Sequence, residues 1–321
     1  MRRSLPAPGL LAILALFALA ACGGQAPGGD AKPVLRVASQ KGGTKALMLA
    51  SHVLDGAPYR VEWSEFPAAQ HLLEALSASA VDVGGVGDAP FIFAYASGGG
   101  KLRAVQATRT AAGGSSVAIV VPPSSPLRTV AELRGRKVAT GRGSVGHYVL
   151  LRVLDRAHLR PGDVQIVFLS PGDAKAAFST GAIDAWSTWG AYVGVATLHD
   201  RARILADGRG LLNGYGFQVA TPAAISAKRP QLADFLHRLT RAQEWARDHR
   251  AAYAQVLAKE TGLPLDVAAY TAEQTRTETV LIDRAVVEEE RQTLARFRDA
   301  GAIDKAPDLT PAFDASFGGA R

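Results

Sequence analysis

The 321-residue chain has one cysteine, Cys22, so it cannot form an intramolecular disulfide. Apart from residues 9–21, it has no apolar run that approaches the roughly 20 residues of a membrane-spanning helix. The histidines show no metal-ligand spacing, and no P-loop, convincing dinucleotide fingerprint or Gly-x-Ser-x-Gly turn occurs. The sequence therefore predicts no metal, no cofactor and no catalytic residues.

The composition is that of a well-packed globular protein, with 48% hydrophobic and 20% charged residues. The formal net charge is +7, and removal of Arg2 and Arg3 with a cleaved signal would lower it to about +5. A positive excess favours attraction of a small anion from a distance. The basic residues are scattered along the chain rather than clustered, so we expect no nucleic-acid partner.

The first 30 residues have the features of an export signal. Two arginines precede the small and apolar run of residues 9–21, which ends in Leu19-Ala20-Ala21-Cys22 and resembles a bacterial lipobox. The resemblance implies a signal peptide at 1–21 and a lipid on Cys22, with residues 22–32 as a flexible tether. A plain signal peptide with an incidental cysteine is the alternative. The anchored protein would lie in the periplasm or at the cell surface, and the sequence leaves the membrane that holds it undecided.

Strands and helices alternate along the rest of the chain, which predicts an open α/β sheet. The order of strand, glycine turn, helix, strand, helix and strand occurs twice, over about 34–88 and again over about 137–189. Predicted strands of the two passes are 34–38, 59–66 and 81–86, then 137–140, 164–168 and 184–187. Predicted helices of the two passes are 45–54, 68–77 and 90–96, then 145–157 and 171–179. This repetition indicates two similar α/β lobes.

The last third of the chain is predicted to be mostly helical, over 231–247, 250–261, 265–272 and 283–300. The run Glu288-Glu289-Glu290 falls within the last of these helices. Such a run is typical of a solvated helix face, and we expect it to be exposed.

The two glycine turns are the places where anion chemistry is expected. Residues 40–44 and 141–144 each lie between a strand and a helix N-terminus, where unpaired N–H groups and the helix dipole favour negative charge. Ser144 adds a hydroxyl donor, and His147 lies one turn into the second helix. A tight turn without a ligand is the alternative at each place.

Eight segments of the chain carry a family resemblance, and in chain order they are 40–42, 62–68, 72–76, 86–90, 137–139, 143–147, 174–178 and 184–189. Together they resemble the aliphatic sulfonate-binding proteins of ABC importers, within the wider group that binds taurine, nitrate and thiamine precursors. The resemblance implies the type II periplasmic binding protein fold, with two α/β lobes joined by two crossing strands near 117–122 and 215–221. It places lobe one at 33–118 and 219–321, and lobe two at 119–218.

The resemblance also implies which residues bind the ligand. The predicted substrate-binding residues are Gln40, Gly42, Gly43, Gly87, Asp88, Ser144, His147, Trp189, Tyr215 and Phe217. Asp88 either contacts the ligand or caps the helix that begins near Pro90. Because alternate residues of a strand face opposite sides, we expect Trp186 in the core and Trp189 beside the ligand.

The family resemblance implies a non-enzymatic, monomeric protein that captures a sulfonate or related small organic anion and passes it to an ABC permease. Residues 189–192 read Trp-Gly-Ala-Tyr where sulfonate binders commonly have Trp-Asp-Pro-Tyr, which leaves the ligand open. A thiamine-related pyrimidine or nitrate is the alternative ligand. An enzyme that reuses the fold and a sensory module are further alternatives.

Overall fold

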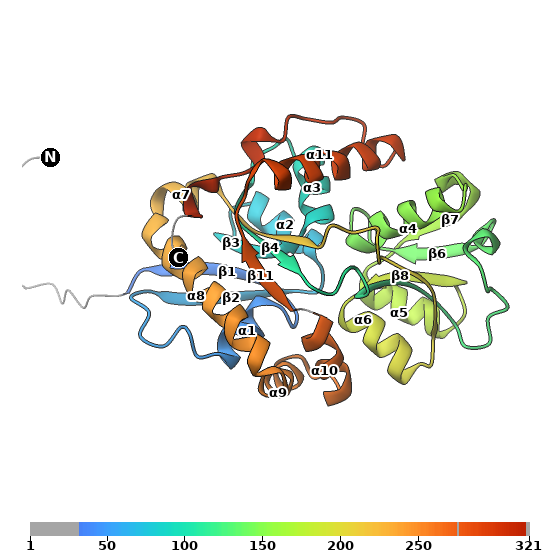
Figure 1. Ribbon diagram of the computed structural model, residues 1–321, viewed down its shortest axis with the longest axis horizontal. Coiled ribbons are helices and arrows are strands. Elements are labelled where there is room, and N and C mark those ends of the chain that lie inside the picture. Colours follow the sequence, from blue (N-terminus) through green and yellow to red (C-terminus); the bar gives the residue numbers. More distant parts are fainter. Residues whose placement is uncertain (1–31, 275, 319–321) are drawn as a thin grey trace, which may run out of the picture. The chain divides into compact units, whose positions relative to one another are not determined.

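The computed structural model describes residues 32–274 and 276–318, in which two mixed sheets carry the α-helices (Figure 1). The predicted signal peptide 1–21, the lipid site Cys22 and the tether up to residue 31 lie outside the described residues. No helix in the described ranges is both long and apolar enough to cross a membrane.

The first sheet has six strands in the order β11-β4-β10-β3-β1-β2. Its strands are β1 (Val34–Gln40), β2 (Arg60–Phe66), β3 (Val83–Gly87), β4 (Arg103–Thr110), β10 (Tyr215–Ala220) and β11 (Thr277–Val280). Strand β1 runs parallel to β2 and β3, whereas β10 runs antiparallel to both β3 and β4. The ends of β1 and β3 that precede helices therefore meet at one edge of the sheet.

The second sheet has five strands in the order β7-β6-β8-β5-β9. Its strands are β5 (Val117–Val121), β6 (Lys137–Thr140), β7 (Gln165–Phe168), β8 (Ala185–Trp189) and β9 (Arg203–Asp207). Strand β6 is parallel to β7 and β8, and β5 is antiparallel to β8 and β9. This order matches β2-β1-β3-β10-β4 position by position, so the two similar α/β units predicted from the sequence are confirmed.

The chain passes between the sheets in two connecting segments rather than in strands. All of β5 pairs within the second sheet and all of β10 within the first, so the passages lie at 111–116 and 208–214. The two segments run close together, because a Cβ added to Gly114 would lie 2.2 Å from the Gly208 carbonyl oxygen. We propose lobe limits within these two segments, a few residues before the predicted limits at 118/119 and 218/219.

The predicted helices are present with differences at some ends, and two short helices, 191–194 and 222–227, were not predicted. The α-helices are α1 (Thr44–Ala50), α2 (Ala69–Ser77), α3 (Asp88–Ser97), α4 (Val145–Arg156), α5 (Pro171–Ser179), α6 (Ala191–Gly194), α7 (Pro222–Ala227), α8 (Arg229–Asp248), α9 (Arg250–Thr261), α10 (Leu265–Gln274) and α11 (Arg284–Asp299). Helix α1 ends four residues before predicted, where the Ser51 hydroxyl donates to the carbonyl of Leu47 at 2.9 Å and the chain turns. Helices α8 and α9 pack against α1 in the first lobe (Figure 1).

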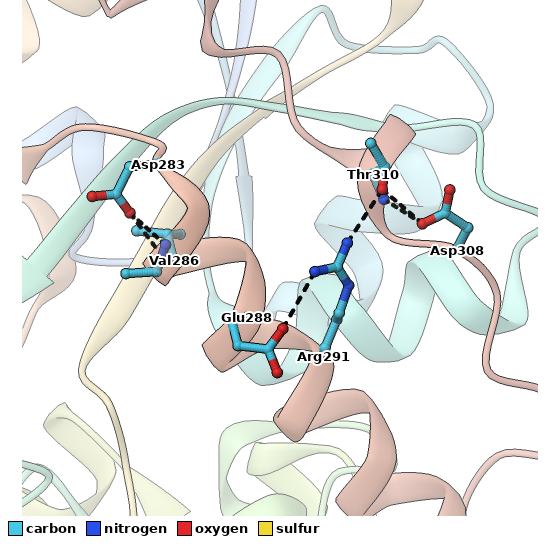
Figure 2. Close-up of polar contacts among 7 residues, drawn as sticks. Asp283, Val286, Glu288, Arg291, Asp308 and Thr310 are labelled. Carbon is cyan, nitrogen blue, oxygen red and sulfur yellow. Dashed lines mark hydrogen bonds and ion pairs between the residues drawn. The ribbon is translucent and has the colours of Figure 1, made fainter.

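Helix α11 is fixed at its start and along its outer face (Figure 2). The Asp283 carboxylate accepts hydrogen bonds from the N–H groups of Ala285 and Val286 at 2.9 and 3.0 Å, which makes it the N-cap. Arg291 donates to Glu288 and to the hydroxyl of Thr310, both at 3.3 Å, and so ties the chain after α11 back onto the helix (Figure 2).

The opposite face of α11 is buried, and it includes one of the three consecutive glutamates. Val286, Glu290, Thr293, Leu294 and Phe297 form this face at helical spacing. The prediction of an exposed acidic run is therefore wrong for Glu290, which is fully buried. The helical period of 3.6 residues, rather than the local charge, decided its position.

Candidate functional site

A cavity of about 230 Å³ lies where the strand ends of both sheets meet the two connecting segments. We call it the cleft cavity. The residues that line it are Gln40, Ala69, Gln70, Gly87, Asp88, Pro90, Thr110, Gly114, Ser116, Val117, Ser144, Val145, Trp189, Gly190, Leu212, Gly214 and Tyr215. Ligand sites of open α/β sheets lie at such strand ends. Six of the ten predicted substrate-binding residues line it: Gln40, Gly87, Asp88, Ser144, Trp189 and Tyr215.

Ser144 forms the second-lobe wall of the cleft cavity. It is the N-cap of α4, where its hydroxyl oxygen accepts the N–H of His147 at 3.0 Å. The 12-residue helix that follows leaves its first N–H groups, among them that of Val145, without an acceptor in their own helix. The Ser144 hydroxyl can still donate its proton, so hydroxyl, N–H groups and helix dipole favour an anion at the same place.

Gly143 allows the second glycine turn, residues 141–144, to lie close to the first lobe. Its φ is +67°, a left-handed conformation that glycine adopts without steric cost. A Cβ at this position would lie 2.3 Å from the Phe93 ring of α3. Only glycine therefore allows the turn and helix α3 to lie this close together.

His147 does not line the cleft cavity, in contrast to its predicted role. Its Nδ1 accepts the N–H of Gly143 at 3.2 Å, and its ring packs edge-on against Phe168 and beside Phe297. Burial, together with the charge of Arg142, lowers the pKa of His147 to about 4. The ring is neutral at pH 7, and its place in the structure is to hold the backbone of the second turn.

The first turn reaches the cleft cavity only through Gln40. The Gln40 side chain donates to the carbonyl of Gly85 at 3.3 Å. Gly42 and Gly43 instead line a separate cavity of about 140 Å³ that faces helices α8, α9 and α10. Gly42 lies against Leu257 of α9, which explains why these glycines are not in the cleft.

Asp88 lines the cavity from the first lobe and also serves the start of α3. It is the first residue of α3, and its carboxylate accepts the N–H of Ala89 at 2.6 Å. Burial raises the pKa of Asp88 to about 6, although hydrogen bonds from Ala89 and Asn213 oppose the rise. The N-cap of α3 is Gly87, and the Asp88 carboxylate bonds within the first turn rather than from the cap position. Contact of Asp88 with a ligand stays a prediction.

Asn213 and Glu290 form a buried polar cluster with Asp88 that the sequence analysis missed. The Asn213 amide donates to Glu290 at 3.3 Å and its oxygen accepts the N–H of Tyr215 at 2.9 Å. Burial and the neighbouring charge of Asp88 raise the pKa of Glu290 well above its usual value and so favour its protonated form. One oxygen of Glu290 has no hydrogen-bond partner within the described residues. The helical spacing of residues 286, 290 and 294 was the signal that could have revealed it.

The aromatic residues divide between the cavity and the core. Trp186 is buried and packs against Phe178, whereas Trp189 lines the cleft cavity, which is the arrangement that strand alternation predicts. Tyr215 also lines the cavity. Phe217 does not, because its ring is buried in the first-lobe core between Phe91 and Phe313, at centroid distances of 5.5 and 5.6 Å.

No basic side chain is among the described residues that line the cleft cavity. Within the same part of the chain, no group of three or more histidine, cysteine or acidic residues is placed to hold a metal ion. The cavity therefore offers an anion hydrogen-bond donors and a helix dipole, with the carboxyl group of Asp88 beside them. Charge-assisted hydrogen bonds from neutral donors are strong enough for such a site.

Comparison with known proteins gives a consistent result. Residues 46–206 match the family model described as "ABC transporter, phosphonate, periplasmic substrate-binding protein". A putative aliphatic sulfonates-binding protein of Escherichia coli is 34% identical over 280 residues, covering 86% of each chain. The alkanesulfonate-binding protein of Xanthomonas axonopodis pv. citri, solved with MOPS bound, superposes with a TM-score of 0.82 at 32% identity, covering 88% of this chain and 98% of its own.

A desulfurization enzyme has a related fold, with a TM-score of 0.65 at 16% identity over 89% of this chain. At this identity the likeness concerns the fold alone. The type II binding-protein fold expected from the sequence is thus confirmed by solved structures.

Proposed function

Because the chain belongs to the periplasmic substrate-binding proteins of ABC transporters, we propose that it captures an alkanesulfonate or related organosulfur anion in the cleft cavity and delivers it to the permease. The observation that carries the proposal is the N-terminus of α4, which brings the Ser144 hydroxyl and unpaired N–H groups to a cavity lined without basic side chains. A sulfonate has three acceptor oxygens and one fixed charge, which suits several converging donors.

The relatives favour a sulfonate over the alternative ligands. Both the E. coli relative and the X. axonopodis structure carry sulfonate-binding names at 34% and 32% identity. Nitrate would leave most of the 230 Å³ empty of ligand. We therefore keep these two ligands as competitors in the binding test.

The protein acts in transport, as its family does, and we propose that it has no catalytic role. The related fold of the desulfurization enzyme makes this proposal worth testing. Incubation with a bound sulfonate should leave the ligand intact by mass spectrometry. Release of sulfite or sulfate by the protein alone would contradict the proposal.

We also propose that Cys22 carries the lipid that anchors a monomeric binding protein to the membrane. The support is the small and apolar run that ends at this cysteine. Cells that express the full chain should incorporate labelled palmitate, and Cys22→Ser should abolish the label and release the protein from membranes. Light scattering of residues 32–321 should give the mass of one chain.

Titration calorimetry on residues 32–321 tests the sulfonate proposal directly. Ethanesulfonate, taurine, sulfate, nitrate and the thiamine pyrimidine form the ligand panel. We expect heat from the sulfonates and none from nitrate or the pyrimidine. At 100 times the dissociation constant a ligand should add about 2.7 kcal/mol to the free energy of unfolding, which a thermal shift detects as a few degrees. Binding of the pyrimidine alone would keep the binding-protein class but overturn the sulfonate assignment.

A further inference from the structure

A second and larger cavity, of about 790 Å³, adjoins the cleft cavity. We call it the outer cavity. Gln70, Pro90 and Trp189 line both cavities, so a molecule held in the first can extend past these residues into the second. The cleft cavity by itself is smaller than the 300–1,000 Å³ typical of small-molecule sites, whereas the outer cavity lies within that range.

Aromatic rings line the outer cavity from both lobes. Phe93 comes from α3 of the first lobe, and Phe168 and Trp189 come from the ends of β7 and β8 in the second. Each ring is partly exposed. Each is also held by an edge contact: Phe93 to Phe297, Phe168 to His147 and Trp189 to Tyr192, at centroid distances of 5.4, 5.0 and 6.1 Å. The rings are therefore fixed in place before a ligand arrives, which lowers the entropic cost of binding.

Arg142 favours an aromatic ring over an alkyl chain in this cavity, which apolar surface alone would not do. Its guanidinium lies 3.9 Å above the centre of the Phe168 ring, and the side chain is exposed on its outer side. Gln70 fixes the backbone here by donating to the Arg142 carbonyl at 3.0 Å. An aromatic ring can stack on a guanidinium and on fixed aromatic neighbours, and an alkyl chain gains only the apolar contact.

We propose that this protein selects sulfonates with an aromatic tail, with the sulfonate in the cleft cavity and the ring in the outer cavity between Phe93, Phe168 and Arg142. This inference rests on the proposed function and names the substrate class within it. The alternative is that the outer cavity is only the solvent-filled approach to the sulfonate site. The experiment below distinguishes a subsite for the aromatic tail from such an approach.

The test compares two sulfonates with six carbons each, benzenesulfonate and hexanesulfonate, with methanesulfonate as a ligand that has no tail. Hydrophobic burial by itself favours the hexyl chain, so a preference for the ring reports stacking. We expect residues 32–321 to bind benzenesulfonate about tenfold more tightly than hexanesulfonate in calorimetry. Phe168→Leu and Arg142→Gln should each reduce this ratio to about threefold or less. Thermal unfolding of both variants without ligand shows whether they fold, and the affinity for methanesulfonate reports any change at the sulfonate site itself.

Arg136→Gln is the matched control, because Arg136 is an exposed arginine of the same lobe that does not line the outer cavity. It should leave the ratio unchanged. Equal affinity for the two six-carbon ligands, or a ratio that neither variant moves, would overturn the aromatic preference while the sulfonate proposal stands. Failure of all three sulfonates to bind would instead overturn the proposed function itself.

Discussion

The two glycine turns, residues 40–44 and 141–144, occupy equivalent places in the two sheets and differ in what they face. Each follows a strand that has parallel neighbours on both sides, β1 in the first sheet and β6 in the second. Each contains a glycine with positive φ, Gly42 at +79° and Gly143 at +67°. Only the second turn presents its helix N-terminus, capped by Ser144, to the cleft cavity.

The difference comes from the C-terminal helices. Helices α8 and α9 pack on α1, and Leu257 and Thr261 of α9 lie against Gly42. Helix α1 has seven residues, and at its start the Ser39 hydroxyl accepts the N–H of Lys45 at 3.1 Å. The comparison teaches that equivalent topology does not give equivalent chemistry: segments added outside the repeat decide which of two similar turns remains open to a ligand.

The sharpest test of this comparison is the paired removal of one hydroxyl from each turn. Ser144→Ala loses a donor to the bound anion, and the cost of about 1–3 kcal/mol corresponds to a dissociation constant raised about 5- to 150-fold. Thr44→Ala, at the start of α1, should change the dissociation constant less than about twofold, because Thr44 lines the separate cavity. Calorimetry with ethanesulfonate measures both. Equal losses in the two variants would mean that the first turn also binds the anion.

The two positive-φ glycines provide a second paired test. In Gly143→Ala the new Cβ would lie 2.3 Å from the Phe93 ring, which Phe297 holds in place, so the turn and α3 must separate. We expect about a tenfold weaker sulfonate affinity, on the scale of 1.4 kcal/mol. In Gly42→Ala the new Cβ meets the ends of two side chains, Leu257 at 3.0 Å and Thr261 at 3.2 Å, rather than a ring. This substitution should lower the free energy of unfolding by about 1–2 kcal/mol through backbone strain and leave affinity within about twofold.

Loss of binding in Gly42→Ala that is as large as in Gly143→Ala would contradict the assignment of the two turns. Thermal unfolding of both variants, measured without ligand, separates a loss of fold from a loss of affinity.

The strand ends beside the two turns differ in charge, and this difference predicts that sulfonate affinity depends on pH. Asp88 follows β3, and the equivalent place after β8 holds Gly190. The pKa of Asp88 is about 6 because the carboxyl is buried, so it ionises as pH rises through 6 and then repels a bound anion. Sulfonate affinity should fall about fivefold between pH 5 and pH 7.5. Asp88→Asn should bind with little pH dependence, and a slope as steep as that of the parent protein would exclude Asp88 as its source.

Local patterns in the sequence predicted much of the fold. Strand 137–140 and helix 171–179 have the predicted ends, and the alternation of Trp186 and Trp189 gave their two environments. Strands β9 and β11 were not predicted, because each lies at the edge of its sheet and none of its residues is fully buried, so the apolar pattern of an inner strand is missing.

The site residues that were misplaced share one physical cause, which is a packing partner far away in the sequence. Phe217 is buried by Phe313, Gly42 is covered by Leu257, and Phe297 packs beside His147. A family motif marks which residues are near a site, and it does not say which of them point toward the ligand. Ser144 lines the cleft cavity as the N-cap of α4, a position that its own helix defines without a distant partner, and its contact with a ligand stays a prediction.

His147 should give the smallest effect on affinity and a distinct effect on stability. His147→Phe keeps a ring between Phe168 and Phe297 but loses the acceptor for the Gly143 N–H, so we expect affinity to weaken by about twofold or less.

The pKa of His147 is about 4 in the fold and about 6.5 when unfolded, so unfolding takes up a proton between these values. The stability that neutral His147 contributes is therefore full above pH 6.5 and is lost as pH falls toward 4. Asp88 and Glu290, whose pKa values are raised, act with the opposite sign, and they remain in both proteins. The melting temperature of the parent protein should thus fall more steeply than that of His147→Phe from pH 6.5 to 4.5, and parallel curves would mean that His147 is already charged in the fold.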